Sequence, residues 1–264
     1  MMHKPSHLLA QYGEQFDDPS VAAAYGRRPP YPDEVFALLE GLLPPGERAV
    51  LELGCGSGDL TLGLASRVDR IDAVDPAAAM LHLARARAGA EHAHIRWVAS
   101  SAEAFEYSGP YGLVVAAESL HWMDWNVVLA KAQAALAPGS WLAIITARSF
   151  GPHAWEDALL GLIREYSTNQ AYRPYDLVDE LTRRDLFREA GRQITGPIEF
   201  SQPVIDYIES FHSRNGFSRD RMTPARAAAF DAALEAVVTP FCPDGVVRAQ
   251  LTATLVWGRP SACR

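Results

Sequence analysis

The sequence predicts an α/β fold built on a doubly wound, mostly parallel sheet of seven strands. Apolar segments with strand character alternate with helical segments between residues 49 and 146, a pattern that is typical of parallel sheets. A turn with three glycines at alternate positions follows the first of these strands. After the fifth strand the alternation stops, and a helical segment is inserted before the last two strands.

The elements are expected in the following order. Residues 1–46 form an N-terminal segment with a short helix that carries Tyr25 and a longer helix near 32–43, which ends at the prolines and glycine of 44–46. Residues 47–147 form the core of alternating strands and helices. Its strands are expected near 49–53, 70–75, 94–99, 112–117 and 140–146, and its helices near 58–67, 77–88 and 125–136.

The pattern after the core predicts a lid. Residues 148–192 contain two amphipathic segments, near 152–167 and 175–190, which we expect to be helices above the substrate. The remainder, 193–264, holds the final strands of the sheet and an additional helical segment. Strands are expected near 194–200 and 247–257, with helices near 203–212 and 223–239 between them. The aromatic residues after the fifth strand are expected to be mainly core: Tyr166, Tyr172, Tyr175, Phe211 and Phe217.

Composition limits the classes of partner. The chain has 264 residues, a net charge of −8 and no basic run, so nucleic acid is not an expected partner. No apolar segment approaches the roughly 18 residues that span a bilayer, so no membrane role is expected. The three cysteines and the scattered histidines have no metal-site spacing, so we expect no metal and a reduced, cytoplasmic setting.

The glycine-rich turn indicates the charge of its ligand. Glu52 precedes the first glycine, Gly54, and Asp59 stands where the next helix begins. A dinucleotide's pyrophosphate needs that helix end free of negative charge, and its fingerprint has a glycine at the position that Asp59 occupies here. A glycine turn bordered by acids therefore favours a ligand that carries positive charge.

Asp75 ends the second strand, about twenty residues after the glycines. An acid at this place and spacing accepts hydrogen bonds from ribose hydroxyls. It is also a candidate N-cap for the next helix, with Pro76 at the first position. The two roles are compatible, because a capping carboxylate has a second oxygen.

The segment Glu52-Leu53-Gly54-Cys55-Gly56-Ser57-Gly58 resembles the first motif of class I S-adenosylmethionine-dependent methyltransferases. The resemblance extends over residues 17–147 and implies the Rossmann-like methyltransferase fold. The pair His121-Trp122 and the segment Trp257-Gly258-Arg259-Pro260 resemble a small-molecule subgroup, with a methyltransferase type 11 domain, that includes trans-aconitate methyltransferases. The implied cofactor is S-adenosyl-L-methionine, with S-adenosyl-L-homocysteine as its product.

The resemblance also implies which residues hold the cofactor. A tyrosine and an arginine of the subgroup close over its methionine end. Here these are Tyr25 and Arg28, with Arg27 as the alternative arginine, because a guanidinium pairs best with a carboxylate. Arg28 could instead be a surface residue before a proline turn. The other implied cofactor contacts are Glu52, Gly54, Cys55, Gly56, Asp75, Pro76, Met80, Ser101, Ala102, Glu103 and Ala117.

The sequence departs from relatives at two of these turns. Ser101 stands where relatives often have an Asp that contacts the adenine, and a serine binds the exocyclic amine less strongly than a carboxylate does. Backbone contacts from Ser101 and Ala102 are the safer expectation, and an ordinary strand-to-helix turn is the alternative. Relatives usually have Asp where this chain has Gly112, so that hydrogen bond is absent.

Methyl transfer from a sulfonium is an in-line displacement, so the protein mainly supplies alignment and desolvation. Where the acceptor needs a base, His121 is the first candidate and Glu118 the second. A carboxylate acceptor would instead need a cationic contact, from Arg148 or an arginine of the lid. The alternative for His121-Trp122 is a packing tryptophan with a surface histidine. Substrate contacts are expected from Tyr31, Trp122, Arg148 and Tyr172.

Three functions follow from these features. The first is methyl transfer to a small-molecule acceptor, without a choice between O, N and C, by a monomer or homodimer. The second is a nicotinamide-dependent oxidoreductase, against which Asp59 and the glycine spacing argue. The third is a non-catalytic protein that binds S-adenosylmethionine.

Overall fold

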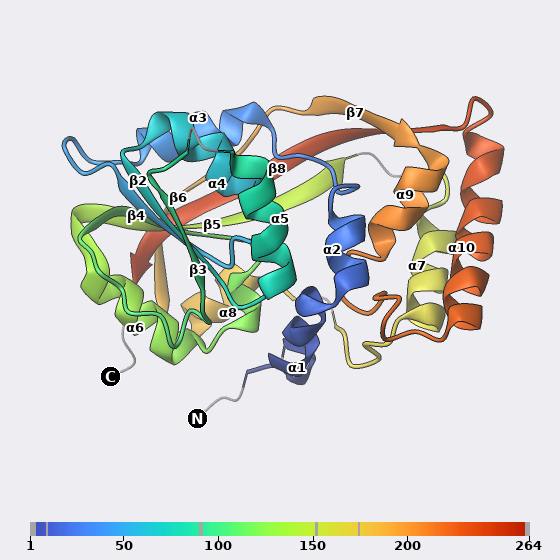
Figure 1. Ribbon diagram of the computed structural model, residues 1–264, viewed down its shortest axis with the longest axis horizontal. Coiled ribbons are helices and arrows are strands. Elements are labelled where there is room, and N and C mark those ends of the chain that lie inside the picture. Colours follow the sequence, from blue (N-terminus) through green and yellow to red (C-terminus); the bar gives the residue numbers. More distant parts are fainter. Residues whose placement is uncertain (1–3, 9, 90–91, 151–152, 174, 262–264) are drawn as a thin grey trace.

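The computed structural model describes residues 4–8, 10–89, 92–150, 153–173 and 175–261. One eight-stranded sheet crosses the molecule, with the strand order β3-β2-β1-β4-β5-β8-β6 and with β7 paired to β8 (Figure 1). The pairs among β1 to β5 are parallel, whereas β8 runs antiparallel to β5, β6 and β7. The strands are β1 (Ala49–Leu53), β2 (Arg70–Asp75), β3 (Ile95–Ala99), β4 (Tyr111–Ala117), β5 (Leu136–Phe150), β6 (Phe187–Ile194), β7 (Ile198–Pro203) and β8 (Val246–Pro260).

Helices cover both faces of the sheet, which confirms the predicted doubly wound α/β class. Residues of α3 (Asp33–Gly41), α4 (Asp59–Leu64) and α5 (Ala78–Ala88) share one buried cluster with the strands. Residues of α6 (Trp125–Ala135) and α8 (Leu177–Arg183) share the other. The central strand β4 is buried throughout and has no charged side chain, as expected for a strand covered on both faces. The remaining helices of four residues or more are α1 (Ala10–Gly13), α2 (Pro19–Tyr25), α7 (Glu156–Tyr166), α9 (Val204–Phe211) and α10 (Pro224–Val238).

The strand order reverses between β1 and β4. In open α/β sheets, ligands usually bind at such a reversal. They lie in the crevice beyond the carboxyl ends of the two strands on either side of it. The glycine turn follows β1 at this point, and Glu118 follows β4. The topology therefore brings the two segments singled out by the sequence to one edge of the sheet.

The second half of the sheet differs in detail from the prediction. The single strand expected near 194–200 is found only in part, because residues 195–197 form a break between β6, which ends at Ile194, and β7, which begins at Ile198. Thr195 bonds to Ala253 of β8 through its backbone and its hydroxyl, and Gly196 and Pro197 then interrupt the strand. Seven strands thus form the continuous path of the sheet, and β7 continues along β8 as an eighth.

The predicted helix over 175–190 is also shorter than expected. It ends at Arg183, and Asp185 takes a left-handed conformation with φ of 57°, which stops a helix of L-residues. Phe187–Ile194 is an edge strand with mostly exposed side chains. The Glu189–Arg192 ion pair within it has the spacing of a helix face, which explains the error.

Beyond the sheet lies a separate helical cluster made of α7, α9 and α10 (Figure 1). Its core includes Trp155, Phe211, Phe217 and Phe230, with Tyr166 packed against it. The expectation that Tyr166, Phe211 and Phe217 are core residues is thus confirmed. The N-terminal helix α2 packs between α5 and α9 and so joins this cluster to the sheet.

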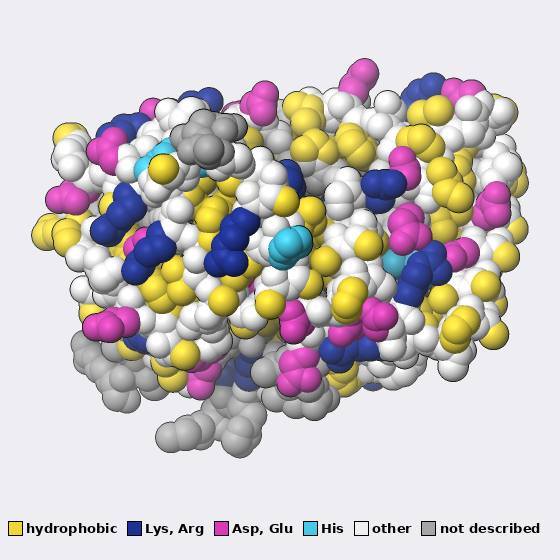
Figure 2. All heavy atoms as spheres, in the orientation of Figure 1, with side chains coloured by type: hydrophobic (Ala, Val, Ile, Leu, Met, Phe, Trp, Pro, Cys, Tyr) yellow, Lys and Arg dark blue, Asp and Glu magenta, His cyan; other side chains and the backbone are white. Residues whose placement is uncertain are grey.

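The surface in the orientation of Figure 1 has acidic and basic side chains interspersed, with small apolar areas between them (Figure 2). No helix within the described residues is long and apolar enough to cross a membrane.

Candidate functional site

The turn after β1 is held close to neighbouring backbone and side chains. Gly54 and Gly56 have φ of 74° and 53°, which glycine adopts at little cost. A Cβ on Gly54 would lie 2.5 Å from Cβ of Ser119, and one on Gly56 would lie 3.4 Å from the Tyr25 hydroxyl. The Gly54 N–H donates to the Val74 carbonyl of β2 across 2.7 Å, which fixes the turn against the end of that strand.

Asp75 is 8% exposed at the end of β2 and accepts two backbone hydrogen bonds. Oδ1 accepts from the N–H of Ala77 and Oδ2 from the N–H of Gly56, both across 2.8 Å. The second oxygen is thus not spare, as the sequence suggested, but ties the glycine turn to the start of α5. Burial raises the pKa of Asp75, and these two bonds oppose the rise. A carboxylate accepts about four hydrogen bonds, so lone pairs remain for a ligand.

A cavity of about 580 Å³ opens beside this turn, a volume within the usual range for small-molecule sites. Sequence analysis did not find the wall contributed by residues 13–17, because that segment has no periodic pattern. Eleven predicted cofactor residues line the cavity: Tyr25, Arg28, Gly54, Gly56, Asp75, Pro76, Met80, Ser101, Ala102, Glu103 and Ala117.

Two predicted cofactor residues, Glu52 and Cys55, lie behind the turn and are absent from the cavity wall. The carboxylate of Glu52 accepts a hydrogen bond from the Thr61 hydroxyl of α4. Burial raises the pKa of Glu52 to about 8, a rise that Thr61 opposes and that Asp59 and Asp75 increase. In the structure Glu52 therefore supports the turn from within the core, and its contact with a cofactor stays a prediction.

The structure separates the two candidate arginines. Arg27 points outward and pairs with Asp206 across 2.6 Å at the surface. Arg28 lines the cavity, with its guanidinium 4.2 Å from the centre of the Tyr25 ring. Its Nε donates to the Ser213 hydroxyl across 2.8 Å, and a second nitrogen donates to the Ser213 carbonyl. Of the two arginines, Arg28 alone lines the cavity.

The turn after β3 is partly occupied by its own hydrogen bonds. The Ser101 hydroxyl accepts from the N–H of Ala104 across 3.2 Å, as in an ordinary strand-to-helix turn. Glu103 accepts from the N–H of Asp124 across 2.7 Å. The backbone and Ala102 thus remain the main surfaces that this turn offers to a ligand.

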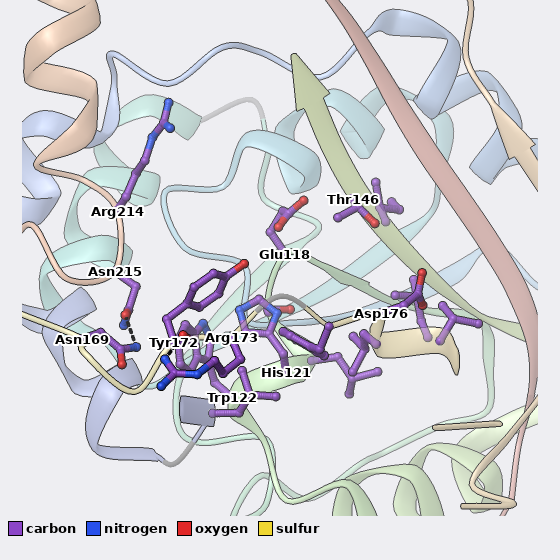
Figure 3. A pocket seen from close by; sticks show the side chains of 18 of the residues that line it. Glu118, His121, Trp122, Thr146, Asn169, Tyr172, Arg173, Asp176, Arg214 and Asn215 are labelled. Carbon is purple, nitrogen blue, oxygen red and sulfur yellow. Dashed lines mark hydrogen bonds between the residues drawn. The ribbon is translucent and has the colours of Figure 1, made fainter. Parts of the chain in front are cut away.

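A second cavity of about 1060 Å³ adjoins the first and shares three wall residues with it, Glu118, Ser119 and Trp122. Its other walls come from β5, β8, α7 and the segments after α7 and α9. Figure 3 shows Tyr172 pointing toward Glu118 and His121 from the opposite wall. The two compartments suit a pair of ligands that meet beside Glu118.

The two catalytic candidates follow β4. Glu118 has φ of 53°, a conformation that is uncommon for residues other than glycine and that is found often at functional sites. It lines both cavities, whereas His121 lines the second. The rings of His121 and Trp122 lie edge to face with centroids 4.5 Å apart, so the pair both packs and faces the cavity.

The predicted substrate contacts are divided by the structure. Trp122 and Tyr172 line the second cavity, although Tyr172 is 54% exposed. Tyr31 lies outside both described cavities and packs against the core under α3. Burial raises its pKa well above the usual range, and the nearby Glu118 adds to the rise. The backbone of Arg148 lies opposite Thr252 where β5 pairs with β8, and its side chain lies outside the described part of the chain.

Several polar residues of the second cavity have no signal in the sequence. Asn169 donates through Nδ2 to Asn215 Oδ1 across 2.7 Å, and Asn215 donates to the Tyr12 carbonyl across 2.6 Å. Arg214 stands beside Asn215 on the same wall (Figure 3). These residues come from three distant segments, so only the folded chain brings them together. Within the described residues, no group of three or more His, Cys, Asp or Glu side chains could hold a metal ion.

Comparison with known sequences agrees with this geometry. Residues 50–139 match the family described as "Methyltransferase domain". Uncharacterized methyltransferase Rv0089 of Mycobacterium tuberculosis is 34% identical over 112 residues, which cover 42% of this chain and 56% of the relative. Uncharacterized methyltransferase Rv3342 of the same organism is 32% identical over 149 residues, 55% of each chain. The matched regions thus span little more than half the length of these curated relatives.

Solved structures extend the similarity to most of the chain. A protein from Anaeromyxobacter dehalogenans, named as an unconfirmed type II methyltransferase, has a TM-score of 0.58 and 24% identity, covering 88% of this chain and 97% of its own. The YcgJ protein from Bacillus subtilis has a TM-score of 0.53 and 15% identity, covering 86% and 99%. The fold is that of the Rossmann-like methyltransferases. In sequence, this chain is similar to methyltransferases over residues 50–139 in the domain match and over about half of its length in the curated relatives.

Proposed function

We propose that this protein transfers a methyl group from S-adenosyl-L-methionine to a small-molecule acceptor. The observation that carries the proposal is the position of Asp75, which faces a cavity formed by the glycine turn while a second cavity adjoins it at Glu118. The match of residues 50–139 to a methyltransferase domain supports it. Subgroup membership with trans-aconitate methyltransferases belongs to the proposal and is carried by the motifs His121-Trp122 and Trp257-Gly258.

The residues of the first cavity fit this cofactor. Gly54 and Gly56 leave room where side chains would otherwise stand, and Asp75 retains lone pairs for ribose hydroxyls. Arg28 offers a guanidinium for a carboxylate, and Glu118 offers negative charge for a cationic centre. When bound, S-adenosylmethionine supplies a methyl group on a sulfonium, an excellent leaving group.

The contribution of the chain is alignment, exclusion of water and, where needed, a proton acceptor. The N-terminal segment, through Tyr25 and Arg28, covers the first cavity and is fastened to the loop after α9 by the Ser213 bonds. His121 at the second cavity is the proposed base for an acceptor with a proton of high pKa, and Glu118 is the alternative. Two adjoining cavities favour in-line transfer by holding the two ligands beside each other.

The second cavity also supports a small acceptor. It is bounded by residues of the predicted lid, 148–192, and by the loop after α9, so it suits a molecule that enters it. We further propose that the protein works in the cytoplasm as a monomer or homodimer.

Isothermal calorimetry with S-adenosylhomocysteine tests the proposal. The wild type is expected to bind at micromolar Kd, and Asp75→Ala is expected to weaken binding about tenfold or more, since charge-assisted bonds to the ribose are lost. Asp69→Ala is the matched control, because Asp69 is an exposed acid just before the same strand.

The outcomes separate the three candidate functions. An absence of binding to the wild type contradicts the proposal, and NADH fluorescence enhancement would then point to the oxidoreductase. Binding that is weakened only by Asp75→Ala supports the assigned site. Binding without turnover across a broad acceptor screen would indicate a non-catalytic protein.

A further inference from the structure

Arg214 projects from the loop between α9 and α10 and lines the second cavity (Figure 3). Its side chain is partly buried, and its guanidinium carbon lies 4.0 Å from the centre of the Phe211 ring. Phe217 and Ile163 line the same cavity. A cation on such an apolar wall has lost part of its hydration, and this loss disfavours the charged form unless an anion compensates for it.

No ion pair among the described residues provides that compensation. By contrast, Arg192 on the wall of the same cavity pairs with Glu189, and Arg219 on the loop after α9 pairs with Glu209 and Asp231. Two side chains act electrostatically on Arg214: Tyr207 raises its pKa, and the like charge of Arg28 lowers it. Asp176 lies at the far side of the view in Figure 3. Burial and Arg28 together lower the pKa of Arg214 to about 10, so the guanidinium stays protonated at neutral pH.

The loop that carries Arg214 is held firmly from several sides. His212 is fully buried, with Nδ1 2.8 Å from the Phe217 carbonyl oxygen and Nε2 2.6 Å from Asp231 Oδ1. The N–H of Gly216 donates to Gln15 Oε1 across 3.0 Å. The fold therefore keeps a charged group in place at a cavity wall without a counter-charge, an arrangement more common at binding sites than in structural cores.

We propose that Arg214 is an anion-binding subsite of the second cavity and that the acceptor is a small organic anion with an apolar body. A single guanidinium fork matches one carboxylate or one phosphate group, and Phe211, Phe217 and Ile163 match the body. The inference extends the proposed function, on which it depends. It concerns the group that anchors the molecule and leaves open which atom receives the methyl group.

The experiment uses the full-length protein saturated with S-adenosylhomocysteine. Three probes share a phenyl-alkyl body: 4-phenylbutyrate, its uncharged amide and phenethyl phosphate. Saturation-transfer NMR titration gives the Kd of each probe for the wild type, for Arg214→Gln and for Arg164→Gln. Arg164 is the matched control, because it is an exposed arginine on the wall of the same cavity.

The proposal expects the wild type to bind at least one anionic probe more tightly than the amide. Arg214→Gln should raise the Kd of that anionic probe about tenfold or more and leave the Kd of the amide unchanged. Arg164→Gln should have little effect on either Kd. A carboxylate preference identifies a carboxylic acid anchor, and a phosphate preference a phosphomonoester anchor. Equal binding of anion and amide, equal loss in both variants, or no anion binding at millimolar concentration overturns the proposal.

Calorimetry with S-adenosylhomocysteine on the same variants keeps this result separate from the proposed function. Unchanged affinity in Arg214→Gln is expected and shows that the loop has kept its fold around Arg28. A loss as large as that in an Arg28 variant would assign Arg214 to the cofactor and overturn the subsite. If the wild type does not bind S-adenosylhomocysteine, the proposed function fails first, and the anion titration then tests the subsite by itself.

Discussion

The guanidinium of Arg28 and the hydroxyl of Ser213 form a 2.8 Å hydrogen bond between segments 185 residues apart. The bond joins the N-terminal segment at the first cavity to the loop that carries Arg214 at the second. One contact thus links the walls of both cavities, and Arg28 contributes both to the cofactor site and to the packing of the loop.

We predict that Arg28→Met weakens S-adenosylhomocysteine binding about tenfold or more, because the cofactor carboxylate loses its guanidinium partner. Arg27→Met is the matched control, since it removes only an exposed pair with Asp206 and should change Kd less than twofold, or about 0.4 kcal/mol. Calorimetry measures both. Equal effects from the two substitutions would remove Arg28 from the cofactor site.

Gly54→Ala should destabilise the protein by about 2–3 kcal/mol and abolish cofactor binding, because the new Cβ would lie 2.5 Å from Cβ of Ser119. Gly46→Ala separates backbone strain from the steric clash. Gly46 has a similar φ of 84° but has open space around it, so the expected loss is about 1 kcal/mol. Urea unfolding measures the difference, and equal losses would argue against the close contact at Gly54.

Glu52 should make stability depend on pH. Its folded-state pKa of about 8 lies above the ordinary 4.5, so the folded state binds more protons between these values. Stability is therefore expected to fall as pH rises from about 4.5 to about 8, by at most about 1.4 kcal/mol per pH unit, and to level off above pH 8. Glu52→Gln should flatten this dependence of stability on pH. Urea unfolding from about pH 5.5 to 8.5, which covers most of the range between the two pKa values, measures it. Parallel curves for the two proteins would contradict the raised pKa.

Glu118 and His121 should differ in their effect on cofactor binding. Glu118 lines both cavities. Glu118→Gln should therefore weaken the binding of S-adenosylmethionine more than that of S-adenosylhomocysteine, because only S-adenosylmethionine carries the positive sulfonium charge. His121 lines the second cavity, and His121→Gln should leave both affinities within about twofold. Calorimetry with both ligands checks this, and an equal loss for both ligands in Glu118→Gln would contradict an electrostatic role.

Sequence reasoning predicted the first half of the molecule better than the second. Strands β1 to β4 and helix α5 lie within about one residue of their predicted bounds, because these elements alternate along the chain and most of them have Gly, Pro or Asp beside an end. The edge strand β6 was missed because most of its side chains are exposed and its charges have helical spacing. An edge strand gets its hydrogen bonds from a distant partner, here β8, so local composition gives little sign of it.

The sequence by itself determined the glycine turn and the acid that closes it. Gly54, Gly56 and Asp75 depend on backbone freedom and strand termination, which are properties of neighbouring residues in the chain. Only the tertiary structure decided that Arg28 rather than Arg27 faces the cavity, and that Arg214 stands on the wall beside it. These positions depend on packing between segments far apart in sequence, and no local pattern encodes such contacts.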